Sequence, residues 1–240
     1  MMKIILGGLE KLDFSATAEN IRVVESVEQL LKKNNDEITY FSTLTEENSN
    51  AVVRNPENVY IPATSLLESH KSLGLHIYFD LESYPFYQKV KEIISKEDQP
   101  KGVFRFRRTV QHDRNHSLLT GDLYTLSSLF GKPQDIRVKQ TDQSVTPSHT
   151  IILMNFGGGT MAHIEYTVSD RERIELEWSG IKKIIEFDSD QMVSIQSTRK
   201  PAQPLAYSVD AILACAQKVD QELIDRLNDF SRLIDGGVYS

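Results

Sequence analysis

The chain has 240 residues, of which 40% are hydrophobic and 25% charged, a composition typical of a globular protein with its own core. Its 34 acidic and 27 basic residues give a net charge of −7, which argues against nucleic acid as a partner. A single cysteine excludes an internal disulfide, and no apolar run approaches the roughly 20 residues of a membrane span. The expected protein is soluble and cytoplasmic, with neither a membrane nor a nucleic-acid partner.

The first hundred residues alternate between strand-like and helix-like periods. Strands are expected at Lys3–Leu6, Glu37–Thr43 and His76–Phe79, and helices at Ser26–Lys33, Ala63–Leu73 and Pro85–Lys96. Gly74 stands where a glycine closes a helix. Strand, helix and strand at short spacing favour parallel βαβ units.

The rest of the chain favours an antiparallel sheet. In Gly102–Arg108, phenylalanines alternate with Arg105 and Arg107, the period of a half-buried strand. A helix is expected at Leu118–Phe130, and a long helix at Ser208–Ile234. Further strands are expected at Asp135–Val138, Thr150–Phe156, Met161–Val168, Arg173–Trp178, Ile181–Phe187 and Met192–Gln196, with a hairpin turn at Gly157–Gly159.

Five segments, in order along the chain, resemble the Gfo/Idh/MocA oxidoreductases, the family of glucose–fructose oxidoreductase and inositol dehydrogenase. They are Ser26–Thr43, Gly74–Glu82, Leu118–Pro133, Phe156–Asp188 and Glu222–Gly236. GLHIYFDLE at Gly74–Glu82, for example, resembles that family's G-K-H-V-x-x-E-K-P segment. The resemblance implies a truncated, divergent member of mixed α/β and α+β class. A reduced Rossmann-like layer over residues 1–98 would precede an α+β domain over residues 99–240 with an open, mainly antiparallel sheet.

The resemblance also implies an NAD(P) site on a glycine-rich turn, which this sequence lacks. Gly7 and Gly8 are followed by Leu9 and Glu10 instead of by a third glycine. A pyrophosphate needs close approach to the backbone, and Glu10 adds negative charge where two phosphates would lie. No cofactor is therefore expected, with NAD(P) as the alternative.

The residues that carry the family's chemistry are replaced as well. Its lysine corresponds to Leu81 and its glutamate to Asp80, while its catalytic histidine and aspartate correspond to Gly121 and Tyr124. Glycine and tyrosine cannot reproduce a His/Asp proton relay. The expected function is that of an oxidoreductase-like pseudoenzyme retained for ligand binding, accessory work or regulation. The alternatives are an NAD(P)-dependent sugar or polyol dehydrogenase with a divergent cofactor site, and a non-redox lyase or isomerase.

If a catalytic site is retained, four side chains are the candidates for acid–base work, although none is a firm assignment. They are Asp80, His116, Asp122 and Tyr124. Tyr124 would need a cation such as Arg105 or Lys101 beside it to act near neutral pH. His112 and His116 have the i, i+4 spacing of a metal pair, but a polar loop is the favoured interpretation and no metal is expected.

Two predictions concern binding. Arg105 and Arg107 are candidate ligand-binding residues for a small anion or sugar, since a guanidinium grips carboxylate or phosphate bidentately. The alternative is a charged solvent face. IILMNF at Ile151–Phe156 is apolar on both alternations, so its sheet must be buried on both faces. This pattern predicts a homodimer through the open sheet.

Overall fold

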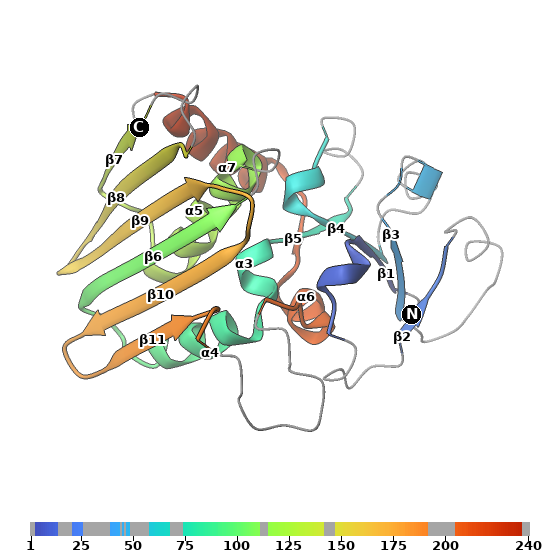
Figure 1. Cartoon of the computed structure of the whole chain (residues 1–240), viewed down its shortest axis with the longest axis horizontal. Helices are drawn as coiled ribbons and strands as arrows, with labels where there is room; N and C mark the ends of the chain where they lie inside the picture. The colour runs from blue at the N-terminus through green and yellow to red at the C-terminus, as the bar shows by residue number, and fades with distance from the viewer. Residues whose placement is uncertain are drawn as a thin grey trace. The chain divides into compact units, whose positions relative to one another are not determined.

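A computed structural model of the chain describes residues 3–13, 21–25, 39–43, 45, 47–48, 58–67, 74–110, 115–141, 147–191 and 205–236. It divides into two compact units, each with one six-stranded sheet (Figure 1). The first unit comprises Met1–Pro85 and Leu205–Asp225, and the second comprises Phe86–Pro204 and Arg226–Ser240. The predicted helix Ser26–Lys33, the predicted strand Met192–Gln196 and His112 lie outside the described residues.

The sheet of the first unit is parallel except at one edge. Its strands are β1 (Lys3–Gly7), β2 (Ile21–Val23), β3 (Thr39–Thr43), β4 (Val59–Pro62), β5 (His76–Tyr78) and β12 (Gln217–Lys218), in the order β12-β5-β4-β1-β3-β2. Only β12 runs antiparallel to its neighbour. Because β1 lies between β3 and β4, the order of strands reverses at β1, and such sheets bind ligands beyond the carboxyl ends of their strands at this point.

Strand β4 was not expected from the sequence. It pairs with both β1 and β5, so it is a central strand of the first sheet. The helix predicted at Ala63–Leu73 is, in its described part, only the short 3-10 helix η4 (Ala63–Ser65), followed by Leu66 in an extended conformation. Proline cannot donate a ladder hydrogen bond, which is why Pro62 is tolerated only at the end of β4.

The second sheet confirms the predicted open, mainly antiparallel architecture. Its strands are β6 (Gly102–Val110), β7 (Asp135–Gln140), β8 (His149–Gly157), β9 (Thr160–Val168), β10 (Arg173–Gly180) and β11 (Ile184–Asp188), in the order β11-β10-β6-β9-β8-β7. Only β6 and β9 pair in parallel. One face buries Phe104, Phe106 and Trp178 on the side of α5 (Asn115–Phe130). In the described part of the second unit no helix packs on the other face, which we call the open face (Figure 1).

The long helix predicted at Ser208–Ile234 is wrong. The segment forms α6 (Val209–Cys215), then β12, then α7 (Gln221–Ile234). Ser208 caps α6 by accepting a hydrogen bond from the Ala211 amide, and the Asp220 carboxylate caps α7 by accepting one from the Leu223 amide. Between the caps, Gln217 pairs with Ile77 of β5. This distant strand satisfies the backbone that a helix would otherwise satisfy, and helical periodicity cannot reveal such a partner.

The units divide at Pro85–Phe86, whereas the sequence suggested a boundary near residue 98. Helix α4 (Pro85–Ile94), which follows α3 (Asp80–Ser83), explains the difference. Its Phe86 ring stacks on Phe187 of β11 at 3.7 Å between centroids, and Tyr87 is buried. The chain then returns to the first unit at Leu205–Asp225, an exchange that a single sequence boundary cannot describe.

Candidate functional site

The carboxyl end of β1 is covered by a tyrosine from β5. The Tyr78 hydroxyl donates a hydrogen bond to the Leu6 carbonyl at 2.9 Å. A Cβ atom at Gly7 would collide with that hydroxyl and lie 3.3 Å from Cζ of Phe41. Burial, and then the negative charge of Asp80, raise the pKa of Tyr78 above its ordinary value, so the phenol keeps its proton and remains a donor. Gly7 therefore makes room for a tyrosine of the protein itself.

The next glycine lies against a carboxylate. A Cβ atom at Gly8 would overlap Oε1 of Glu10 and lie 3.0 Å from Cδ of the same side chain. Glu10 belongs to η1 (Leu9–Lys11), a single 3-10 turn that follows β1. A negative charge thus lies directly beside the backbone that, in a dinucleotide site, would approach the phosphates.

An asparagine closes the carboxyl ends of β2 and β3. The Asn48 amide donates hydrogen bonds to Oγ of Ser42 at 2.9 Å, to the carbonyl of Thr43 at 3.0 Å and to the carbonyl of Glu25 at 3.1 Å. Asn48 is itself buried. Polar groups that a bound ribose or phosphate could use at these two strand ends are therefore engaged by one side chain.

These contacts decide whether a dinucleotide fits the residues present at β1. A pyrophosphate needs bare backbone amides at a glycine turn and a field that favours anions. The end of β1 instead holds the Tyr78 hydroxyl, the Glu10 carboxylate and, on the next strand, the Asn48 amide. The residues present do not fit a dinucleotide in the pose that this kind of sheet ordinarily offers.

Of the predicted catalytic candidates, only Asp80 belongs to the first unit. It opens α3 directly after β5, and its carboxylate accepts a hydrogen bond from the Tyr84 hydroxyl at 3.2 Å. Tyr84 is fully buried and packs against Tyr207 with ring centroids 5.1 Å apart. Asp80 thus fixes an aromatic cluster at the end of β5.

Asp122 is buried in an ion network inside the second unit. Its carboxylate accepts hydrogen bonds from Nη1 of Arg108 at 2.9 Å and from the Tyr166 hydroxyl. Arg108 also contacts Glu172 at 3.1 Å. The side chains of Arg108 and Asp122 are 0% and 1% exposed. A carboxylate held this way by an internal cation fixes α5 to β6 and β9, and it does not reach solvent.

Tyr124 and His116 lie at different places along α5. The Arg226 guanidinium lies 4.5 Å from the centre of the Tyr124 ring, so Arg226 supplies the cation beside this tyrosine. Arg105, which the sequence suggested for that position, points to the open face. His116 is exposed at the start of α5 and its Nε2 lies 3.1 Å from the Asp235 carboxylate. The two side chains make these separate contacts and do not form a relay.

Arg105 and Arg107 lie on the open face, where they confirm the predicted alternation of β6. Arg105 donates to Glu177 at 2.6 Å and to Oγ of Ser179 at 3.2 Å, while Arg107 contacts Glu165 at 3.1 Å. A hollow of about 480 Å³ opens beside them. Its lining residues are Arg105, Arg107, Glu175, Leu176, Glu177, Glu186, Phe187, Asp188 and Gln191. Four carboxylates against two guanidiniums make its field unfavourable for an anion, so anion binding here stays a prediction.

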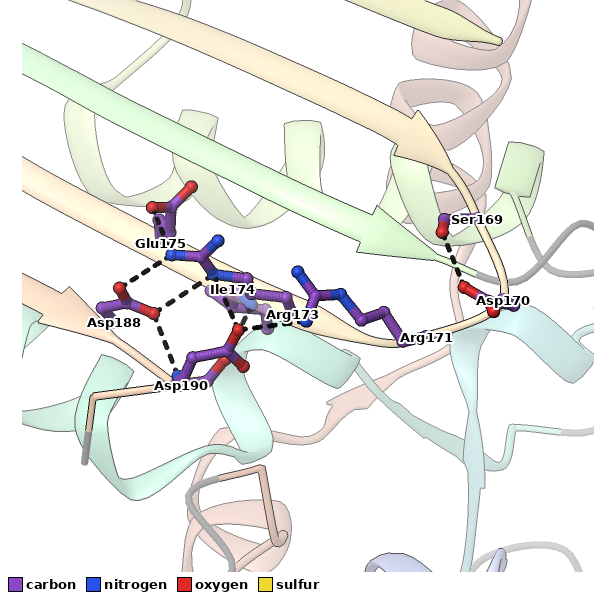
Figure 2. Close-up of polar contacts among 9 residues, drawn as sticks. Ser169, Asp170, Arg171, Arg173, Ile174, Glu175, Asp188 and Asp190 are labelled. Carbon is purple, nitrogen blue, oxygen red and sulfur yellow. Dashed lines mark hydrogen bonds and ion pairs between the residues drawn. The ribbon is translucent and has the colours of Figure 1, made fainter. Parts of the chain in front are cut away.

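A second ion cluster borders this hollow at the β10–β11 edge. Figure 2 shows Arg173 among Glu175, Asp188 and Asp190, with contacts of 2.8 Å to Glu175, 2.8 Å to Asp188 and 3.3 Å to Asp190. The hydrogen bonds from Arg173 hold the pKa of Asp188 below its ordinary value, and the same bonds raise the pKa of Arg173. Arg173 thereby ties two neighbouring acidic strands together.

Two further searches covered the described part of the chain. No group of three or more histidine, cysteine, aspartate or glutamate side chains there is placed to hold a metal ion. No helix there is long and apolar enough to span a membrane.

Solved structures identify the fold. A dehydrogenase from Chromobacterium violaceum matches with a TM-score of 0.56 at 9% identity, over 98% of this chain and 94% of that one. A probable dehydrogenase from Thermotoga maritima matches with a TM-score of 0.52 at 11% identity, over 98% of this chain and 87% of that one. The chain has the fold of the Gfo/Idh/MocA oxidoreductases. The sequence resemblance is thus confirmed for the fold, although no protein-family model and no curated protein matches the chain.

Within this oxidoreductase fold, sequence reasoning missed the residues that occupy the end of β1. Tyr78 was counted only as part of a strand, and no local pattern announces that its hydroxyl reaches Leu6, 72 residues away. Arg108 was grouped with Arg105 and Arg107. The alternation of β6 already places Arg108 on the same side as Phe106, which was a sufficient signal that it is buried.

Proposed function

We propose that this protein is a non-catalytic accessory protein on an oxidoreductase fold, and that it does not use NAD(P) at the end of β1. The observation that carries the proposal is the Tyr78 hydroxyl on the Leu6 carbonyl, in the space that a side chain at Gly7 would need. The Glu10 carboxylate beside Gly8 supports it, because it opposes a pyrophosphate electrostatically. A buried, hydrogen-bonded phenol is costly to displace.

The candidate acid–base groups support the same proposal. Asp122 is neutralised by Arg108 inside the core, and His116 is held by Asp235 at the surface. General acid–base catalysis needs a group within hydrogen-bond reach of the substrate proton. A working sugar or polyol dehydrogenase would need the nicotinamide to bind somewhere other than the end of β1, and it is the principal alternative outcome of the test.

The test is calorimetric titration of NADH and of NADPH into the full chain, with the change in nicotinamide fluorescence as a second readout. We expect no binding up to millimolar cofactor. A dehydrogenase with an intact glycine turn, titrated in the same buffer, shows that the assay detects binding. Micromolar affinity, equivalent to about −8 kcal/mol, would overturn the proposal. In that case the Glu10→Gln variant would show whether the cofactor lies at β1, because removing this charge would strengthen binding there.

We also propose that the open face is the protein's working surface and that it pairs two copies of the chain. Three apolar side chains on β8 and β9 support this: Ile151, Leu153 and Met161 are 41%, 42% and 44% exposed. Apolar side chains gathered on one sheet face are typical of an interaction surface. Sedimentation equilibrium of the full chain tests the pairing, and a monomer at about 100 µM would reject the dimer without affecting the cofactor proposal.

A further inference from the structure

The open face carries its charges in an ordered pattern that can be followed row by row across the strands. One row, which we call the Arg105 row, contains Glu186, Glu177, Arg105, His163, Leu153 and Arg137, in order from β11 to β7. The next row, the Arg107 row, contains Asp188, Glu175, Arg107, Glu165, Ile151 and Lys139. Both rows begin with two acids and end with an apolar residue and a base.

The acidic end of the Arg105 row is not neutralised internally. Glu177 and Glu186 lie directly opposite each other on β10 and β11, an arrangement that is destabilising for like charges. Glu177 is held by Arg105, whereas Glu186 has no ion-pair partner among the described residues. The neighbouring acidic pair, Glu175 and Asp188, is bridged by Arg173 (Figure 2). A cation from outside the chain would complete the Glu177–Glu186 pair as Arg173 completes its neighbour.

The basic end of the same row offers such a cation. Arg137 on β7 is 77% exposed, and its one printed partner is Asp135, two residues away on the same strand. Beside it, Leu153 and Ile151 rise from β8. The hollow on β6, β10 and β11 faces out from the opposite half of the sheet. One half of the face is therefore acidic and hollowed, and the other half is basic and apolar.

We propose that two copies pair with their open faces together around a two-fold axis that runs parallel to the strands, between β6 and β9. This inference rests on the proposed dimer and specifies its geometry. Such an axis exchanges β11 with β7, β10 with β8 and β6 with β9, and it keeps each row opposite itself. Glu186 then faces Arg137 of the second copy, and Arg107 faces Glu165 of the second copy. Leu153 of the second copy lies over Glu177, at the hollow.

Charge selects this axis over the other face-to-face arrangement. A two-fold axis perpendicular to the strands would place β11 on β11 and would bring the unpaired Glu186 side chains of both copies to the same edge. Like charges across an interface are strongly unfavourable, whereas an isologous contact made twice doubles each favourable pair. Two twisted sheets that pack face to face lie about 10 Å apart with strands inclined by roughly 30°, a spacing that arginine and glutamate side chains span together.

The experiment uses two single variants of the full chain, Glu186→Arg and Arg137→Glu. In either variant alone, both symmetry-related contacts become repulsive, and we expect the dimer to weaken roughly tenfold or more. An equimolar mixture of the two variants should form a heterodimer, in which both contacts are again attractive. Sedimentation equilibrium gives the association constants, and native mass spectrometry identifies the heterodimer. Lys96→Glu, an exposed residue of α4, makes the same change in net charge and should leave the association unchanged.

The outcomes separate this inference from the one on which it rests. A monomeric wild-type chain overturns both. A wild-type dimer whose single variants weaken but do not associate on mixing overturns the strand-parallel axis and leaves the dimer standing. A dimer that neither variant weakens places the contact on another surface and overturns both the axis and the open face. Association restored only in the mixture supports the proposed geometry.

Discussion

The two sheets of this protein treat their exposed polar groups in opposite ways. In the first unit, the strand ends where a cofactor would lie in this fold are closed by the protein's own side chains, with Tyr78 on Leu6 and Asn48 on Ser42. In the second unit, the open face leaves Glu186 and Arg137 at opposite edges of one row. The comparison teaches that a retained fold does not imply a retained site. Groups that satisfy one another within the chain indicate that a ligand is absent, and groups left apart indicate where a partner belongs.

The largest effect is expected inside the second unit, at Asp122. Asp122→Ala leaves the buried Arg108 guanidinium with Glu172 but without its closest carboxylate. Uncompensated burial of a charge should lower the free energy of unfolding by about 3–5 kcal/mol. Urea denaturation followed by the fluorescence of Trp178, the single tryptophan, reports on this unit.

The matched control for this variant is Glu92→Ala, which removes a carboxylate from the exposed pair with Lys96. Its effect should stay within about 0.5 kcal/mol, because exposed pairs contribute little. Equal losses in the two variants would show that Asp122 is not the buried anchor described above, and would weaken the contrast between the closed interior and the open face.

The second largest effect tests the closure of β1. Gly7→Ala places a methyl group on the Tyr78 hydroxyl, and the overlap should cost about 1–3 kcal/mol of stability. Tyr78→Phe alone loses the hydrogen bond to Leu6, at about 1 kcal/mol. Thermal denaturation followed by circular dichroism, together with hydrogen exchange of β1 amides, measures both.

A double-variant cycle sharpens this test. Once the hydroxyl is removed, the nearest remaining atom of that ring is 3.7 Å from the new methyl group, so Gly7→Ala should cost less in the Tyr78→Phe background. Gly8→Ala is the control, since its methyl group meets only the flexible end of Glu10. Additive effects of Gly7→Ala and Tyr78→Phe would contradict the closure of β1 by Tyr78.

Most of the second sheet could be predicted from the sequence, because each of its strands alternates between a buried and an open face. The alternation of Phe104 and Phe106 with Arg105 and Arg107 fixed both the strand and the outward direction of the arginines. Successive strands with short turns then predicted antiparallel neighbours. The one parallel pair, β6 with β9, could not be predicted, since it depends on a partner 58 residues further along, as in Gly102 with Thr160.

The first sheet was harder to predict for a physical reason. Its central strand β4 has four residues, and the sequence from Val59 to Pro62 shows neither clear alternation nor a long apolar run. Strand β12 exists only because β5 lies beside it. The contacts that close the site, such as Tyr78 with Leu6, join residues distant in sequence. Missing glycines could therefore argue against a dinucleotide, but they could not show what takes its place.

A smaller effect, dependent on pH, is expected at the border of the open face. Because Arg173 depresses the pKa of Asp188 below its ordinary value of 3.8, the pair stabilises the fold above that value and loses its contribution as the pH falls through the lowered pKa. Arg173→Gln should therefore be less stable than the wild type at neutral pH, and the difference should shrink as the pH falls below 4. Urea denaturation at a series of pH values measures it.

The control for the pH series is Arg171→Gln, whose guanidinium is 65% exposed and lies 3.5 Å from Asp190. It should show almost no pH-dependent difference. A difference between Arg173→Gln and the wild type that stays constant from neutral pH to pH 2 would mean that packing, and not the ionised Asp188, accounts for the stabilisation.

The smallest effect on stability is expected at Arg105, on the open face itself. Arg105→Ala removes contacts to Glu177 and Ser179 from an arginine that is 44% exposed, and in dilute, monomeric protein the cost should stay within about 0.5 kcal/mol. The same change leaves Glu177 and Glu186 opposite each other with no cation between them. Self-association should therefore respond to Arg105→Ala more strongly than unfolding does, as measured by sedimentation and urea denaturation on one preparation. A loss of stability with unchanged association would make Arg105 a structural residue of the sheet, and the open face would no longer differ from the closed ends of β1.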